Sequence, residues 1–164
     1  MKFSIIRKLI ALAIALSSFN AYTQVFDIYV SDAGNFNAPP WQIVRYDENG
    51  ENPSVFIDQN LYWPQDILFL EDRNIVLISN FGSGKINVHD AESGDFISVF
   101  AQGLAGPTRL KIGPDSQLYV LLWEGNERVH RYEPNGTDLG PFISGGVKSS
   151  IGIDWDRHGN LYLF

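Results

Sequence analysis

Cysteine is absent from this sequence of 164 residues. Its absence excludes a disulfide framework, and it also excludes a thiol that could be lipidated after an export signal. The fold must therefore be stabilised by packing and strand pairing. Basic side chains are also few, because 12 Lys and Arg stand against 19 Asp and Glu and give a formal net charge of −7. Such a surface repels phosphate backbones, so we expect no binding to nucleic acid.

The sequence also lacks an apolar run long enough to cross a membrane, since a spanning helix needs about 18 or more apolar residues. A shorter apolar run, 9–16, follows the basic residues Lys2, Arg7 and Lys8, and small and polar residues follow it. This order is typical of an export signal. We therefore predict a cleaved signal peptide at 1–23 and a secreted, periplasmic or cell-surface protein of a bacterium. Removing three of the 12 basic residues and none of the 19 acidic ones would leave a net charge of −10.

Short motifs of common enzyme classes are missing too. There is no Gly-x-Ser-x-Gly nucleophile elbow, no phosphate-binding loop and no His-Glu-x-x-His pair. The segment 154–159 is similar to the start of a calcium loop, but His158 occupies its fifth position, where an oxygen ligand is required. We expect His89 to pack in the core and His158 to be exposed. His130 has no evident carboxylate or serine partner in the sequence, so no catalytic triad is predicted.

The sequence does contain an internal repeat with a period of 43 residues. Three copies of one apolar strand begin at Ile75, Leu118 and Leu161, and the segments that precede them align at the same spacing. A fixed period in the forties, filled with short β patterns, indicates one supersecondary unit per repeat. A leucine-rich solenoid would have a shorter period, and a β-sandwich would not repeat one register at a constant interval.

Turn sequences divide each repeat into four short strands. In the second repeat we predict strands at 66–71, 74–80, 85–90 and 96–101, and in the third at 109–113, 117–123, 128–133 and 139–144. Four antiparallel strands per repeat form a blade of a β-propeller. The predicted fold class is therefore all-β: a β-propeller of four-stranded antiparallel blades, with about three blades present.

The ends of the repeat array are incomplete. We predict one propeller domain, 24–164, with blade units near 25–62, 63–105 and 106–148 and a partial unit at 149–164. The first unit opens at its second strand and so lacks an inner strand. Propellers have 4–8 blades, and six at this period would need about 258 residues. We therefore expect an open arc, because about three blades are too few to close a propeller. Its open ends should expose apolar residues such as Ile153 and Trp155 and promote self-association.

The segment Gly-Pro-Thr-Arg-Leu at 106–110, followed by Gln-Leu-Tyr-Val at 117–120, resembles the NHL-type repeat. Ser-Ile-Gly-Ile at 150–153 and Asn-Leu-Tyr-Leu at 160–163 repeat the pattern. The resemblance extends to the six-bladed propellers of the gluconolactonase, senescence-marker-protein and virginiamycin-B-lyase superfamily. It covers 25–164 and is specific for the blade, not for an enzyme. It implies a six-bladed, funnel-shaped domain, of which this chain would be the N-terminal half. In the central pocket of that domain, lactonase-type members bind one divalent cation.

The repeat register suggests which residues face that pocket. Asp32, Asn80 and Glu124 follow second strands, and they are the candidate ligands for a cation such as calcium, which prefers several oxygen ligands. Asp66 and Arg109, which begin inner strands, and Trp123 are the candidate ligand-binding residues. Trp63 lies between two blades, and with Trp123 it would form an aromatic lip at the pocket mouth; packing between blades would explain both tryptophans equally well.

Two functions follow from these observations. The first is a secreted propeller that binds a small molecule, a glycan or a protein through its funnel without catalysis. The alternative is a metal-dependent lactonase, hydrolase or lyase that uses the same central pocket. No catalytic residue is assigned, because the sequence shows no nucleophile with an evident base.

Overall fold

The computed structural model describes residues 26–36, 38–146 and 149–164. The predicted signal peptide, 1–23, lies outside the described residues. Within the described part the chain is all-β, with a single 3-10 turn at Glu71–Arg73. No helix there is long and apolar enough to span a membrane.

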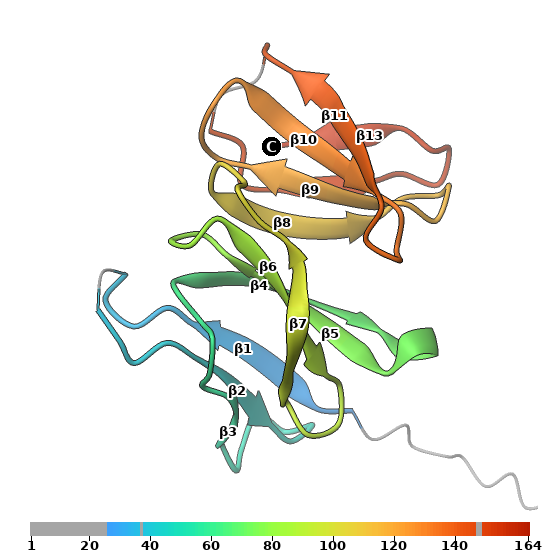
Figure 1. The fold of residues 1–164 in the computed structure, drawn as a ribbon. Helices are drawn as coiled ribbons and strands as arrows, with labels where there is room; N and C mark the ends of the chain where they lie inside the picture. Colours follow the sequence, from blue (N-terminus) through green and yellow to red (C-terminus); the bar gives the residue numbers. More distant parts are fainter. Residues whose placement is uncertain (1–25, 37, 147–148) are drawn as a thin grey trace, which may run out of the picture.

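The described strands form four antiparallel sheets. In Figure 1 the blue, green and orange sheets follow one another from bottom to top, and the red C-terminal strands lie behind the orange sheet. Two of these sheets have four strands each, in chain order, as expected for blades. Blade 1 contains β1 (Ile28–Asp32), β2 (Gln42–Tyr46) and β3 (Ser54–Ile57). Blade 2 contains β4 (Pro64–Leu70), β5 (Ile75–Asn80), β6 (Lys85–Asp90) and β7 (Phe96–Ala101). Blade 3 contains β8 (Pro107–Ile112), β9 (Leu118–Leu122), β10 (Glu127–Tyr132) and β11 (Asp138–Ser144), and the C-terminal hairpin contains β12 (Ile153–Trp155) and β13 (Leu161–Leu163).

The all-β fold with four-stranded blades is as predicted. Among the described residues, blade 1 has the three strands β1, β2 and β3. The predicted bounds of β6 and β7 match the structure. The inner strands β4 and β8 begin two residues earlier than predicted, at Pro64 and Pro107. In each, a bulge follows the proline, because the register shifts before Asp66 and before Arg109. A proline is tolerated at the first position of a strand, where no ladder hydrogen bond from its nitrogen is needed.

The apolar core lies between the sheets. Ile43 and Ile57 of blade 1 pack with Val76 and Ile78 of blade 2. The opposite face of blade 2 packs on blade 3 through a larger cluster that includes Leu77, Ile86, Leu118 and Val120. Strand alternation places Ile78 and Leu77 on opposite faces, so each complete blade has two buried faces. Shortening one of these fully buried side chains to alanine would cost about 2–5 kcal/mol.

One expectation about the open ends is wrong. Ile153 is 7% exposed and Trp155 is half-buried, because both turn toward blade 3, where the indole packs edge-on against Tyr119 at 5.0 Å between ring centroids. The outward side of the hairpin instead exposes Tyr162 and Phe164. The exposed apolar residues of blade 1 include Phe26, Val30 and Val55. Because blade 1 does not meet the hairpin through these faces, the described blades form an open arc.

Candidate functional site

One end of the blades brings most of the predicted site residues to the same side of the molecule. Inner strands β4 and β8 begin there, and second strands β5 and β9 end there, since Pro64 pairs with Asn80 and Pro107 with Leu122. Blade 1 joins at the same level, because the Ser31 hydroxyl donates to the Pro64 carbonyl (2.9 Å). We call this side the axial end. Asp32, Asn80, Trp123 and Glu124 all lie there.

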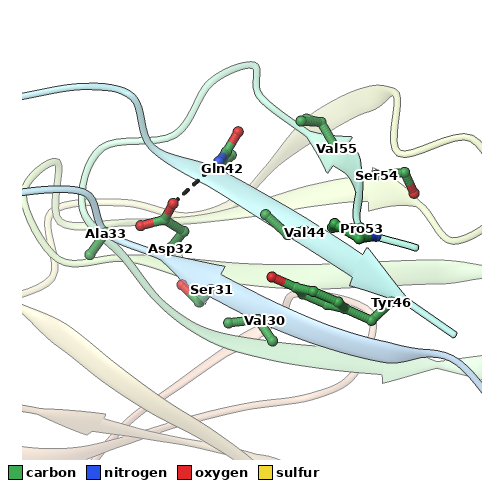
Figure 2. Close-up of a pocket in the computed structure, with 10 residues that line it drawn as sticks. All are labelled: Val30, Ser31, Asp32, Ala33, Gln42, Val44, Tyr46, Pro53, Ser54 and Val55. Atoms are coloured by element: carbon green, nitrogen blue, oxygen red, sulfur yellow. Dashed lines mark hydrogen bonds between the residues drawn. The ribbon is translucent and has the colours of Figure 1, made fainter. Parts of the chain in front are cut away.

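The three candidate cation ligands differ in their burial and in the hydrogen bonds that their side chains already form. The Asp32 carboxylate accepts from the Gly34 N–H (2.9 Å) and from the Gln42 amide (3.2 Å), a bond drawn in Figure 2. Asn80 is fully buried, and its amide oxygen accepts from the Tyr62 N–H (2.9 Å) while its amide nitrogen donates to the Ile78 carbonyl (3.2 Å). Glu124 is exposed. Within the described ranges, no three His, Cys, Asp or Glu side chains group closely enough to hold a metal ion.

Asp66 and Arg109 connect blades 2 and 3. The Asp66 carboxylate accepts from the Leu110 N–H at 2.7 Å, and the Arg109 guanidinium donates to the Gln65 carbonyl at 3.2 Å. Burial raises the pKa of the Asp66 carboxyl, and the hydrogen bond from Leu110 and the charge of Arg109 oppose that rise. Both side chains therefore link the inner strands β4 and β8, whatever else they contact.

An aromatic cavity of about 260 Å³ lies at the axial end between blades 2 and 3. Trp63 and Trp123 both line it, as the aromatic-lip prediction requires, and Trp123 is 36% exposed. The other residues that line it are Gln65, Phe81, Thr108 and Ile151. Two of its polar atoms form hydrogen bonds within the chain: the Thr108 hydroxyl donates to the Leu121 carbonyl (3.2 Å), and the Gln65 amide nitrogen donates to the Pro64 carbonyl (3.3 Å). The cavity thus offers mainly ring and alkyl surface.

The rings around this cavity support one another. Trp63 packs against Phe81 at 4.6 Å and against Phe36 at 5.3 Å between ring centroids. Phe81 in turn lies over Gly106, where an added Cβ would come within 2.7 Å of the ring. Gly106 also has a φ of +65°, so the ring and the backbone both require glycine there. The sequence register did not reveal Phe81 or Ile151, because both lie in loops where side-chain direction does not follow strand alternation.

A larger cavity, of about 430 Å³, lies on the open face of blade 1 and reaches the axial end at Ser31 and Asp32. Figure 2 shows its lining side chains, including Val30, Val44, Tyr46 and Val55, along strands β1 and β2 and near the start of β3. These are the side chains that a further blade would cover, as blade 2 is covered by blade 3. We therefore assign this cavity to packing between blades and not to a ligand.

One histidine forms a contact that the sequence did not predict. The His130 imidazole lies 2.6 Å from the Asp138 carboxylate across the β10–β11 hairpin, so the expectation of no carboxylate partner is wrong. Register shifts on both sides of His130 hid this pairing from the sequence. The hydrogen bond from His130 lowers the pKa of Asp138. His89 is fully buried against Phe96, with burial lowering its pKa, and His158 is exposed, both as predicted.

No protein-family model matches the sequence, and no curated protein matches it significantly. Solved structures do match. A chain of the nidogen/laminin complex superposes with a TM-score of 0.70 at 18% identity, over 84% of this chain and 51% of that chain. A protein described as a putative gluconolactonase gives 0.60 at 18% identity, over 79% of this chain and 44% of that chain. A gluconolactonase from Xanthomonas campestris gives 0.59 at 18% identity, over 76% and 41%.

The chain has the β-propeller fold. At these identities the likeness shows the fold alone, and the chain spans about half the length of the structures that it matches. The propeller neighbours include both a chain solved in a protein–protein complex and gluconolactonases, so the fold by itself does not separate binding from catalysis.

Proposed function

We propose that this propeller is an exported binding module that recognises a protein through the aromatic cavity at its axial end. The observation that carries the proposal is the convergence of Trp63, Phe81 and Trp123 from three different loops on one exposed cavity. Tryptophan is enriched among the residues that dominate binding energy, because it buries a large rigid surface. The match to a chain from the nidogen/laminin complex supports a protein as the partner.

The chemistry of the cavity limits which chemical groups of a partner can bind in it. Its surface is mainly ring and alkyl carbon, so a polar ligand would find few partners there and would lose its own hydration. An apolar side chain of a partner would instead displace water from ring and alkyl surface. We therefore propose that the partner inserts an aliphatic or aromatic side chain between Trp63 and Trp123.

Selection of peptides from a displayed random library against the purified chain tests this function. Peptides with an apolar anchor should be enriched, and Trp123→Ala should weaken their binding at least tenfold, the usual loss at an anchoring residue. Phe142→Ala is the matched control, because Phe142 is also exposed (42%) but lies on the outer strand β11. Selected peptides that bind both variants equally would contradict the proposal.

The second candidate is a metal-dependent lactonase, favoured by the gluconolactonase neighbours and by the Asp32 and Glu124 carboxylates at the axial end. Calcium titration by calorimetry, with Asp32→Asn and Glu124→Gln beside the unchanged chain, tests the ligand assignment. Hydrolysis of glucono-δ-lactone with and without calcium tests catalysis. Calcium binding that both variants weaken, together with calcium-dependent hydrolysis, would replace the binding function by the enzymatic one.

Export is part of the proposal and is supported by the basic, apolar and small-residue order of 1–23. Expression in a Gram-negative host followed by N-terminal sequencing of the periplasmic or secreted product tests it. A mature N-terminus near residue 22 or 24 is expected, whereas an uncleaved product retained in the cytoplasm would contradict export.

A further inference from the structure

Two hairpin turns that the repeat makes equivalent each contain an Asn-Gly pair. Asn49-Gly50 lies in the turn from β2 to β3, and Asn135-Gly136 lies in the turn from β10 to β11, two 43-residue periods further along the chain. Asparagine is a chemically labile residue, because the main-chain nitrogen of the next residue can attack its side-chain amide carbon. Glycine in the next position hinders this attack least, since it has no side chain. Both pairs are therefore reactive by sequence.

The main chain of the two turns is the same, so it does not distinguish the two asparagines. Both glycines have a positive φ, +74° at Gly50 and +96° at Gly136. The same two main-chain hydrogen bonds close each turn, at 2.9–3.0 Å: Asp47 N–H to the Glu51 carbonyl and Gly50 N–H to the Asp47 carbonyl in blade 1, and Glu133 N–H to the Thr137 carbonyl and Gly136 N–H to the Glu133 carbonyl in blade 3.

The side chains differ in which of them accepts the second N–H after the asparagine. In blade 3, the Thr137 N–H donates to the Asn135 amide oxygen at 2.9 Å. In blade 1, the equivalent N–H of Glu51 donates to the Asp47 carboxylate at 2.9 Å, and this hydrogen bond lowers the pKa of Asp47. The Asn49 side chain thus forms no hydrogen bond with any residue that the structure describes. Its amide can rotate, whereas the amide of Asn135 is held.

The surroundings of the two turns differ in the same direction. No heavy atom lies within 4 Å of the place that a Cβ on Gly50 would occupy, whereas the Phe100 ring lies 3.8 Å from the same place at Gly136. The Arg73 guanidinium also donates to the Pro134 carbonyl, which fastens the blade 3 turn to blade 2. The blade 1 turn is therefore the one that can rearrange for the attack.

We propose that Asn49 is a site of spontaneous deamidation in the folded protein and that its repeat equivalent Asn135 is protected. The Gly50 nitrogen forms a bond to the Asn49 Cγ, and the bond from Cγ to the amide nitrogen breaks. The amide nitrogen leaves as ammonia and takes the Gly50 proton. Water then opens the resulting succinimide ring and leaves aspartate or isoaspartate at position 49. The net change is one water consumed, one ammonia released and one carboxyl group gained.

The new carboxylate appears far from the aromatic cavity. Both turns lie at the end of the blades opposite the axial end, because the strands β2 and β10 run away from that end. At position 49 the carboxylate joins Asp47, Glu48 and Glu51, so the like charges repel and loosen the turn. Deamidation therefore marks the age of the molecule at one hairpin and leaves the axial end unchanged.

Peptide mapping by mass spectrometry tests the site on the purified chain during incubation at mildly alkaline pH. In the folded chain, Asn49 should deamidate about fivefold faster than Asn135, the factor expected when one hydrogen bond must first break. In the urea-unfolded chain the two rates should become nearly equal, because glycine follows both residues. Asn49→Gln should abolish the early acidic species in isoelectric focusing, since glutamine would need a larger ring. Asn135→Gln is the matched control and should leave that species in place.

Two results would overturn the proposal. One is a folded chain in which Asn135 reacts as fast as Asn49 or faster, because the hydrogen bond from Thr137 would then give no protection. The other is a difference of the same size in the folded and in the unfolded chain, because the neighbouring sequence and not the turn structure would then set the rates.

Discussion

Three residues one repeat apart share a left-handed backbone just before an inner strand. Trp63, Gly106 and Ser149 have φ values of 54°, 65° and 56°. Any residue other than glycine loses about 1–2 kcal/mol in this conformation. Trp63 is a bulky residue at a position that glycine fills in blade 3, and its ring contacts with Phe36 and Phe81 offset that cost. Because Gly106 and Ser149 adopt the same backbone, this conformation is a property of the repeat and not of Trp63 alone.

Replacing Trp63 by glycine and by alanine separates the contribution of the ring to stability from that of the backbone conformation. Both variants lose the ring contacts and should unfold at lower urea concentration. Trp63→Gly should nevertheless be more stable than Trp63→Ala by about 1 kcal/mol, because glycine adopts a positive φ without strain. Urea denaturation followed by circular dichroism measures the difference. An alanine variant as stable as the glycine variant would show that the backbone is not strained.

The buried Asp66 carboxyl predicts a pH dependence of stability. Burial raises its pKa in the folded chain above the ordinary value of 3.8 for an aspartate. Between 3.8 and the raised value, the folded chain holds a proton that the unfolded chain has released, so the Asp66 contribution to stability falls as pH rises through this window. Above the window the destabilisation is complete, and below 3.8 it is absent.

Asp66→Asn removes this titration and keeps an oxygen that can accept from Leu110. It should be at least as stable as the unchanged chain at pH 7, and this advantage should shrink as the pH falls toward 4. Asp66→Ala should be less stable than Asp66→Asn, because the Leu110 N–H loses its acceptor, at a cost of about 1–3 kcal/mol. Thermal melts at several pH values measure both effects. An advantage of Asp66→Asn that grows on acidification would reverse the assigned direction.

Among the elements, β7 is the least protected outer edge. It pairs with β6 on one side only, and Ile97 and Val99 are 52% and 40% exposed. The outer strand β11 contains Gly140 and Pro141, and β3 has only four residues, both of which discourage pairing with another chain. β7 has neither protection.

A charge on β7 should therefore improve solubility without loss of stability. Ile97→Lys is expected to lower light scattering of concentrated samples and to change the unfolding free energy by no more than about 0.5 kcal/mol, as is usual for exposed positions. Thr137→Lys, in the turn before β11, makes the same charge change away from an open edge and serves as the control. Equal scattering of the two variants would mean that β7 does not mediate association.

The sequence predicts the repeated elements well and the particular contacts poorly. The 43-residue register was sufficient to place β6 and β7, since alternating side chains and turn residues act locally. It also predicted that Trp63 and Trp123 lie at the mouth of one pocket. It did not show that Asn80 is buried under the backbone of Tyr62, or that a bulge carries His130 to Asp138. These contacts depend on which loop folds over which strand end, and a local pattern does not contain that information.

At the scale of the whole molecule, the arc leaves an apolar sheet face at each end. Residues 24–164, expressed by themselves, should self-associate, because each blade is stabilised mainly by its neighbours and no described residue covers either outer face. Size-exclusion chromatography with light scattering should show oligomers whose size increases with concentration. Tyr162→Lys and Val55→Lys, one on each outer face, should shift the distribution toward monomer. A monodisperse monomer with a sharp thermal transition would contradict this prediction.

The left-handed position before each inner strand has a wider consequence. Blades 2 and 3 and the C-terminal hairpin keep one backbone there but carry three very different side chains: an indole, a hydrogen and a hydroxymethyl group. The repeat therefore specifies the conformation of the main chain at this position and does not specify which side chain the position carries. A duplicated unit of this kind can change its recognition surface by single substitutions, one per blade, without a new design of its core. Specificity in such a protein can evolve separately from its architecture.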